Sequence, residues 1–174
     1  MKKALFLDRD GVVNIDKGYL IDKENTEFIA GVFDLIRCAR IKNYLIIIIT
    51  NQSGIGRGIF SEREFLIFNS WFLDELDNNN ARIDDLFYCP THPDKGIGNY
   101  KKNDFRRKPN PGMIIEASNK YNLDLKKSFL IGDKLTDMEA GYSAGVKNLF
   151  LYSKIYSCVY AEKIKSLKEV EKFL

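Results

Sequence analysis

The sequence is short of the residues that mark secreted, metal-rich and membrane-spanning proteins. Among 174 residues there are three cysteines, one histidine, four prolines and one tryptophan. Cys38, Cys89 and Cys158 are widely separated and odd in number, which argues against a disulfide framework. The longest apolar run, at 45–49, is too short to cross a bilayer. We therefore expect a cytoplasmic protein that has no membrane partner.

A strong excess of one charge is also missing. The formal net charge of +3 suits a small anionic substrate and does not require a nucleic-acid partner. Lys2 and Lys3 precede an apolar stretch, but Asp8 ends that stretch far too early for a secretory signal. With 45% hydrophobic residues the chain can build a full core, so we expect one domain over residues 1–174, acting as a monomer.

Strand and helix patterns alternate along the chain. Apolar runs at 4–7, 44–49, 86–88, 129–131 and 149–151 predict strands. A capping box of Ser61 and Glu64 predicts one helix start, and Asn110 followed by Pro111 predicts another. We also expect a short helix at 138–144 that ends at Gly145, and a closing surface helix over 162–174. This alternation predicts an α/β fold with a doubly wound, mostly parallel sheet and no separate cap domain.

Two carboxylates follow the first predicted strand. Asp8 and Asp10 lie at i and i+2 on an extended segment, so their side chains point the same way. Like charges held that close require a cation or a shared proton. The alternative is a solvated turn, which Asp and the following Gly11 favour by themselves. The next segment, 11–30, predicts a β-hairpin or flap above these residues.

Groups that bind phosphate and metal follow the other strands. Thr50 and Asn51 end the second strand, and Asp133 ends the fourth. Arg107 and Lys108 stand at a junction between a loop and a helix. Because the carboxyl ends of parallel strands share one edge of the sheet, these groups are expected to meet there. Clustered carboxylates favour Mg²⁺, and hydroxyl, amide and lysine donors suit a phosphate, so the pattern predicts phosphoryl transfer.

Four segments together resemble the motifs of the haloacid dehalogenase (HAD) superfamily of phosphatases. They are DRDG at 8–11, ITNQ at 49–52, RKP at 107–109 and GD at 132–133. Within that superfamily, the longer stretches DRDGVVN at 8–14, TNQSGI at 50–55 and RKPNPGM at 107–113 look most like the D-glycero-D-manno-heptose 1,7-bisphosphate 7-phosphatases. The histidinol-phosphatases share much of this pattern.

The resemblance implies a two-step mechanism. Asp8 attacks phosphorus and becomes an aspartyl-phosphate, while Asp10 protonates the leaving oxygen and later deprotonates the hydrolytic water. It also implies Mg²⁺ held by Asp8, by the backbone carbonyl of Asp10 and by Asp133. Thr50 would hold phosphoryl oxygens and Lys108 would neutralise their charge.

Substrate contacts are implied on the flap, at the strand ends and in the basic loop. These residues are Asp16, Gly18, Tyr19, Thr50, Asn51, Gln52, Ser53, Arg107, Lys108 and Lys134. Arg107 and Lys134 suit a second phosphate or sugar hydroxyls, and Lys134 equally suits a simple ion-pair partner of Asp133. Asp137 is expected to orient its loop or cap a helix rather than bind metal. The implied substrate is a small phosphorylated sugar, a heptose 1,7-bisphosphate, on the route to nucleotide-activated heptose and lipopolysaccharide precursors.

The chain departs from the family in the loop at 89–108. The relatives carry a structural zinc loop, Cys-x-His and then Cys-x-Cys before the Arg-Lys-Pro motif. Here Cys89 remains, but Thr91, Asp104 and Arg106 replace the other three ligands. A closed zinc site takes four ligands, so we expect no structural zinc, and a mixed site of Cys89, His92 and Asp104 is the weaker alternative.

Two other functions remain open at this point. A polynucleotide 3′-phosphatase shares parts of the TNQ and RKP segments, and Lys101 and Lys102 add basic charge nearby. The chain lacks an aromatic platform interleaved with that basic charge, so no nucleic-acid partner is expected. A catalytically silent phosphosugar-binding scaffold is the other alternative, but such drift would more readily remove Asp8, Asp10 or Asp133, which are all present.

Overall fold

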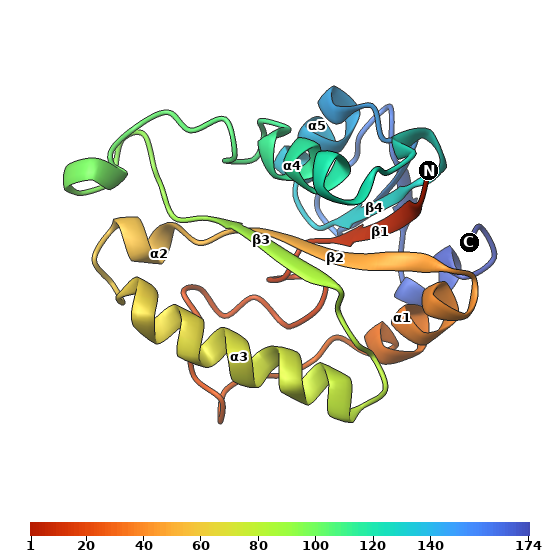
Figure 1. The fold of residues 1–174 in the computed structure, drawn as a ribbon, viewed down its shortest axis with the longest axis horizontal. Coiled ribbons are helices and arrows are strands. Elements are labelled where there is room, and N and C mark those ends of the chain that lie inside the picture. Colours follow the sequence, from red (N-terminus) through yellow and green to blue (C-terminus); the bar gives the residue numbers. More distant parts are fainter.

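The computed structural model describes all residues 1–174, and its centre is one sheet of six parallel strands. The order across the sheet is β3-β2-β1-β4-β5-β6 (Figure 1). The strands are β1 (Lys3–Leu7), β2 (Tyr44–Asn51), β3 (Asp85–Cys89), β4 (Phe129–Gly132), β5 (Asn148–Tyr152) and β6 (Glu162–Ile164). This confirms the predicted doubly wound α/β fold, and the sheet is entirely parallel.

Helices cover both faces of the sheet. The α-helices are α1 (Val32–Ile41), α2 (Ser53–Gly56), α3 (Glu62–Asn78), α4 (Gly112–Tyr121) and α5 (Leu135–Ala144). Short 3₁₀ turns are η1 (Gly98–Tyr100), η2 (Leu125–Lys127) and η3 (Leu167–Val170). In Figure 1, α1 and α3 lie below the sheet, and α4 and α5 lie above it. Each face therefore has its own apolar core.

The central strand β1 joins the two cores. Leu5 and Leu7 point into the core between the sheet and helices α1 and α3. Ala4 and Phe6 point into the core between the sheet and helices α4 and α5. All four side chains are fully buried. An uninterrupted apolar strand is what a parallel sheet with two covered faces requires. The packing fixes β1 on both sides, so the polar residues that follow Leu7 begin at a rigid point.

Two predicted helix boundaries are confirmed at their caps. The backbone amide of Glu64 donates to the Ser61 hydroxyl at 3.2 Å, and the Ser61 amide donates to the Glu64 carboxylate at 2.7 Å. At the other end of the fold, Gly145 caps α5 with φ of 89°, a conformation that costs glycine little.

The start of α4 differs from the prediction by one residue. Pro111 is the N-cap and Gly112 is the first helical residue. Asn110 does not cap this helix, because its side-chain amide donates instead to the backbone carbonyl of Asp104 at 3.1 Å. Asn110 thus closes the preceding loop, and the helix has no side-chain cap at this end.

The segment 11–30 forms a flap but not a β-hairpin. Its two arms meet through an isolated bridge between Asn14 and Phe28, extended by a hydrogen bond from the Ile15 amide to the Glu27 carbonyl at 2.8 Å. Gly18 and Tyr19 both adopt positive φ, of 68° and 47°. Two consecutive left-handed residues interrupt any strand, so the alternating pattern produces turns here.

The prediction of a closing surface helix at 162–174 was wrong. Glu162–Ile164 forms β6, which pairs with β5, and the chain then makes one 3₁₀ turn at Leu167–Val170. Ile164, Leu167 and Val170 are buried in the core of α1 and α3. Their spacing of three residues, which resembles a helix face, instead reflects an edge strand followed by a single tight turn. No helix anywhere in the chain combines the length and apolarity needed to span a membrane.

Candidate active site

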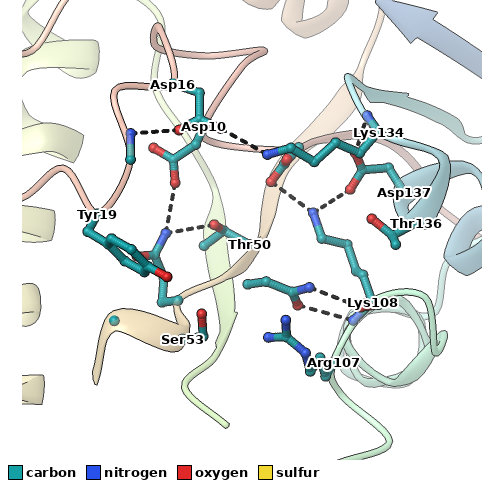
Figure 2. A pocket seen from close by; sticks show the side chains of 15 residues that line it. Asp10, Asp16, Tyr19, Thr50, Ser53, Arg107, Lys108, Lys134, Thr136 and Asp137 are labelled. Atoms are coloured by element: carbon teal, nitrogen blue, oxygen red, sulfur yellow. Dashed lines mark hydrogen bonds and ion pairs between the residues drawn. The ribbon is translucent and has the colours of Figure 1, made fainter. Parts of the chain in front are cut away.

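A polar cleft of about 470 Å³ lies at the carboxyl ends of β1, β2 and β4 (Figure 2). The flap, the start of α2, the Arg107–Lys108 junction and the start of α5 enclose it. Its lining residues are Asp8, Asp10, Asp16, Gly18, Tyr19, Thr50, Asn51, Gln52, Ser53, Gly54, Arg107, Lys108, Lys134, Thr136 and Asp137. The strand ends therefore meet as the parallel sheet requires.

Lys108 lies at the bottom of the cleft between two carboxylates. Its Nζ is 2.8 Å from Asp8 Oδ1 and 2.6 Å from Asp137 Oδ1 (Figure 2). It also donates to the Ile49 carbonyl at 3.0 Å. The side chains of Asp8, Lys108 and Asp137 are at most 8% exposed. A buried ammonium with three oxygen partners is held rigidly at a point where anionic oxygens could also be bound.

Burial and the ion pairs shift the pKa values of Asp8 and Lys108 in opposite directions. Burial raises the pKa of Asp8 well above its usual range, and the nearby Asp137 and Asp133 raise it further while Lys108 lowers it. Burial alone would lower the pKa of Lys108, but Asp137 and Asp8 raise it above its ordinary value. Lys108 is therefore fully protonated. Its single positive charge does not balance the negative charges that Asp8, Asp133 and Asp137 carry when they are ionised.

The same acids form a candidate metal centre. Carboxylate oxygens of Asp8, Asp133 and Asp137 all lie within 4.8 Å of one another. Asp133 Oδ1 is buried and has no hydrogen-bond partner. Burial raises the pKa of Asp133 to about 6, although Lys134 opposes the shift. An orphaned carboxylate oxygen beside a second buried carboxylate fits a hard divalent cation such as Mg²⁺.

Asp10 points away from this acidic group, toward the flap and α2. Its Oδ2 accepts from Gln52 Nε2 at 3.0 Å (Figure 2), and its Oδ1 accepts from Asn14 Nδ2 at 3.0 Å. Arg9 contacts both oxygens. Gln52 also donates to the Thr50 hydroxyl at 2.8 Å, which links the acid to the end of β2. Asp8 and Asp10 are thus neighbours in sequence with separate surroundings.

Asn51 joins the end of β2 to the Lys108 backbone. Its side-chain amide donates to the Lys108 carbonyl at 3.0 Å, and the Lys108 amide donates to Asn51 Oδ1 at 3.1 Å. The Asn51 side chain therefore fixes the Lys108 backbone to the end of β2. Arg107 Nη1 donates to the Thr91 carbonyl at 3.0 Å.

The flap is tied to the far side of the cleft by an ion pair. Lys134 Nζ is 2.9 Å from Asp16 Oδ2 and 3.8 Å from Asp133 Oδ2. Burial works to raise the pKa of Asp16, but the bonds from Lys134 and from the Gly18 amide lower it overall. Lys134 thus contacts the acid on the flap more closely than its sequence neighbour. Tyr19 lies on the same flap, and its ring is 5.4 Å from the Arg57 guanidinium carbon.

The structure brings all but one of the sequence-predicted site residues into the cleft wall. The exception, Asp133, joins Asp8 and Asp137 in the acidic cluster. Asp137 caps its helix as expected, since its Oδ2 accepts from the Lys134 amide at 3.0 Å. Its ion pair with Lys108 and the contacts of Arg9 were not predicted. The ion pair and the packing of Arg9 against α3 connect residues that are distant in sequence, and the only signal for Arg9 was its place between two carboxylates.

The loop at 89–108 is held by direct hydrogen bonds. Cys89 Sγ lies 3.1 Å from Thr91 Oγ1, and that hydroxyl donates to Asp104 at 3.3 Å. His92 Nδ1 accepts from the amides of Asp94 and Lys95, at 3.2 and 3.1 Å. These side chains are engaged with each other and with the backbone, and the absence of zinc stays a prediction.

Comparison with known proteins gives consistent similarities. The family described as HAD-hydrolase-like matches residues 105–164. The chain is 48% identical to the D-glycero-alpha-D-manno-heptose-1,7-bisphosphate 7-phosphatase of Burkholderia mallei, over 86% of this chain and 79% of that one. It is 44% identical to the D-glycero-beta-D-manno-heptose-1,7-bisphosphate 7-phosphatase of Vibrio cholerae, over 83% and 78% of the two chains.

A solved structure supports the same similarity. It is a D,D-heptose 1,7-bisphosphate phosphatase from B. bronchiseptica complexed with magnesium and phosphate. The TM-score is 0.83 with 26% identity, over 98% of this chain and 97% of that one.

Proposed function

This chain belongs to the HAD superfamily and, within it, to the heptose-1,7-bisphosphate 7-phosphatase family of phosphoric monoester hydrolases; from that premise we propose that it removes the C7 phosphate of D-glycero-D-manno-heptose 1,7-bisphosphate through an aspartyl-phosphate on Asp8. The observation that carries the proposal is the position of Asp8. It is a buried carboxylate at the end of the central strand, it lines the cleft, and the Lys108 ammonium lies 2.8 Å away.

Asp8 supplies the nucleophile. Its carboxylate oxygen attacks phosphorus, an ester bond forms to Asp8, and the bond to the leaving sugar oxygen breaks. The Asp8 backbone amide donates to the Ile131 carbonyl at 3.0 Å, and the Arg9 amide donates to Asp8 Oδ1 at 2.8 Å. That bond and Lys108 leave Oδ2 as the oxygen with fewer partners, so Oδ2 is the attacking atom in this proposal.

Asp10 handles the protons. It gives a proton to the leaving oxygen in the first step and takes one from water in the second, which hydrolyses the ester on Asp8. The two aspartates lie in different surroundings, and Lys108, together with bound Mg²⁺, would favour the ionised form of Asp8 that attacks phosphorus. Asp8 is among acids and a lysine, and Asp10 accepts from uncharged amides as well as from Arg9.

Asp8, Asp133 and the backbone carbonyl of Asp10 would hold Mg²⁺. When bound, Mg²⁺ supplies positive charge that offsets the clustered carboxylates and the phosphoryl oxygens. The buried and unpartnered Asp133 Oδ1 supports this assignment. Lys108, the Thr50 hydroxyl and the Asn51 backbone amide would bind the oxygens of the transferring phosphoryl group.

The remaining wall residues suit the rest of a sugar bisphosphate. Arg107 and Lys134 are cations at the rim that could contact a second phosphate, and Asp16, Gln52 and Ser53 offer partners for hydroxyls. Gly18 and Tyr19 shape the flap above them. This substrate places the enzyme in the synthesis of nucleotide-activated heptose for lipopolysaccharide.

A direct assay tests the proposal. Purified protein with Mg²⁺ would be given the α and β anomers of heptose 1,7-bisphosphate, histidinol phosphate and a 3′-phosphorylated oligonucleotide. We expect phosphate release from a heptose bisphosphate with the greatest kcat/KM, and none from the oligonucleotide. A larger kcat/KM for histidinol phosphate would overturn the substrate, and no phosphate release from any of them would overturn the activity.

Two variants test the assigned steps. Asp8→Asn should abolish turnover because the nucleophile is lost. Asp10→Asn should lower kcat by about 10²–10⁴-fold while the thermal unfolding curve stays close to wild type. Wild-type turnover in purified Asp10→Asn would contradict the role of that residue.

A further inference from the structure

Arg9 is a buried cation that the proposed chemistry does not use. Its Nε and Nη2 lie 2.9–3.2 Å from the two carboxylate oxygens of Asp10. Nη2 also donates to the backbone carbonyl of Leu20, on the flap, at 3.1 Å. The Arg9 side chain is 1% exposed, so it cannot reach a substrate in the cleft.

Three aromatic rings from α3 enclose the guanidinium. Its central carbon is 5.8 Å from the ring of Phe65, 5.5 Å from Phe68 and 5.9 Å from Phe72. A desolvated cation among ring faces is held by cation–π attraction and by packing. The aromatic stripe on α3, whose spacing indicates simple core packing, therefore also fixes the position of a charge.

The paired contact constrains Asp10 in a way that a single donor would not. A planar guanidinium that meets a carboxylate through two nitrogens sets both the distance and the plane of the carboxylate. Asn14 and Gln52 add one donor each from the sides. Because the guanidinium offers two nitrogens to the carboxyl group, it can keep one bond to Asp10 even when the other oxygen carries a proton.

We propose that Arg9 is a positioning residue, which holds the Asp10 carboxyl in the orientation from which it protonates the leaving oxygen and links that orientation to the flap through Leu20. The proposal rests on the proposed function, because it assigns Asp10 the role of general acid. Arg9 donates no proton and forms no bond to substrate: the proton on the leaving oxygen comes from Asp10, and the phosphoryl group goes to Asp8.

Substrates whose leaving groups differ in their need for a proton can distinguish a positioning role of Arg9 from a purely structural one. Nitrophenolate departs without needing a proton, whereas a benzyl alkoxide needs one. A misplaced acid should therefore slow the cleavage of benzyl phosphate and spare that of p-nitrophenyl phosphate. The ratio kcat/KM is the suitable measure, because it covers the steps up to the first irreversible loss of the leaving group.

The experiment compares wild type, Arg9→Met and Arg9→Lys on these two substrates with Mg²⁺ present. For Arg9→Met we expect kcat/KM on benzyl phosphate to fall by about 10–10²-fold, a part of what general acid catalysis supplies, and kcat/KM on p-nitrophenyl phosphate to fall by less than about 3-fold. Arg9→Lys, which keeps the charge but has no fork, should show a smaller selective loss and provides the test if Arg9→Met does not fold.

The control is Leu76→Ala, a fully buried position on the same helix α3. It should lower stability and affect both substrates by the same factor. Equal losses on both substrates in Arg9→Lys would overturn the positioning role and leave the proposed function intact. If wild type released phosphate neither from these two substrates nor from heptose 1,7-bisphosphate, the proposed function itself would fail, and the role of Arg9 with it.

Discussion

At the scale of single residues, the strongest constraint in the site is the charge balance around Lys108. One ammonium faces Asp8 and Asp137, both within 2.8 Å, and Asp133 is close to both acids. Ions removed from water are costly unless their partners compensate them. We therefore expect Lys108 to contribute to the stability of the fold as well as to the proposed contact with phosphate.

Replacing Lys108 by methionine should show this directly. Lys108→Met leaves Asp8 and Asp137 buried without their cation, and the free energy of unfolding should fall by about 3–5 kcal/mol in metal-free buffer at neutral pH. Urea denaturation measures the change. Lys134→Met is the matched control, since its half-exposed ammonium should be worth less than about 1 kcal/mol. Equal stability of the two variants would contradict the argument.

Residues at strand ends could be predicted, and residues whose role depends on distant partners could not. The position of Asp8, Thr50 and Lys108 in one cleft could be predicted, because the carboxyl ends of parallel strands share one edge of the sheet. Arg9 was passed over because its charge pairs with a neighbour but is enclosed by α3, more than fifty residues later. No spacing rule connects the two segments.

At the scale of elements, the carboxyl-terminal segment is part of the core and not an added surface helix. Leu167 and Val170 are fully buried against the face that holds α1. The pattern at 162–174 was misread because three apolar residues at helical spacing fit both a helix and a strand with a turn. Because residues 162–164 can pair with the free edge of β5, the segment forms a strand and a turn and not a helix.

Truncating one of these side chains tests that placement. Leu167→Ala should lower the free energy of unfolding by about 2–5 kcal/mol, because the cavity lies in a packed core. Lys168→Ala, at the exposed neighbouring position, is the control and should change it by less than about 0.5 kcal/mol. Thermal or urea unfolding measures both. A similarly small change in the free energy of unfolding of the two variants would contradict the burial of this segment.

The loop at 89–108 gives a second prediction at this scale. Burial raises the pKa of the Cys89 thiol, while the Thr91 hydroxyl lowers it, and the thiolate that zinc requires is disfavoured overall. We expect purified protein to contain no stoichiometric zinc and its unfolding temperature to be unchanged by a zinc-selective chelator. Metal analysis and calorimetry measure this. One zinc per chain would show that Cys89, His92 and Asp104 form a mixed site after all.

At the scale of the whole molecule, we expect the acidic cluster to make stability depend on pH and on added Mg²⁺. The pKa of Asp133 is raised to about 6, chiefly by burial, and that of Asp8 is raised as well. A raised pKa in the folded state means that the contribution to stability is fully present below the unfolded pKa of about 4 and is lost as pH rises through about 6. Metal-free protein should therefore lose stability across that interval.

Added Mg²⁺ should reverse this loss, because it binds the ionised carboxylates. We expect a small rise in unfolding temperature with Mg²⁺ at about pH 5 and a larger one at about pH 8, where saturation at 100 times Kd adds about 2.7 kcal/mol. Differential scanning calorimetry at both pH values measures it. Asp133→Asn serves as the control, and should respond weakly to Mg²⁺ at either pH. An equal response at both pH values would contradict the assignment.

The central position of β1 also affects how the chain can fold while it is being synthesised. Leu5 pairs with Ile46 on one side and with Phe129 on the other, so a strand made among the first residues waits for most of the chain before its second neighbour exists. Until then an apolar edge with free backbone donors and acceptors stays bare, which invites pairing with other nascent chains. Fragments that end before residue 129 should accordingly aggregate and should lack enzymatic activity.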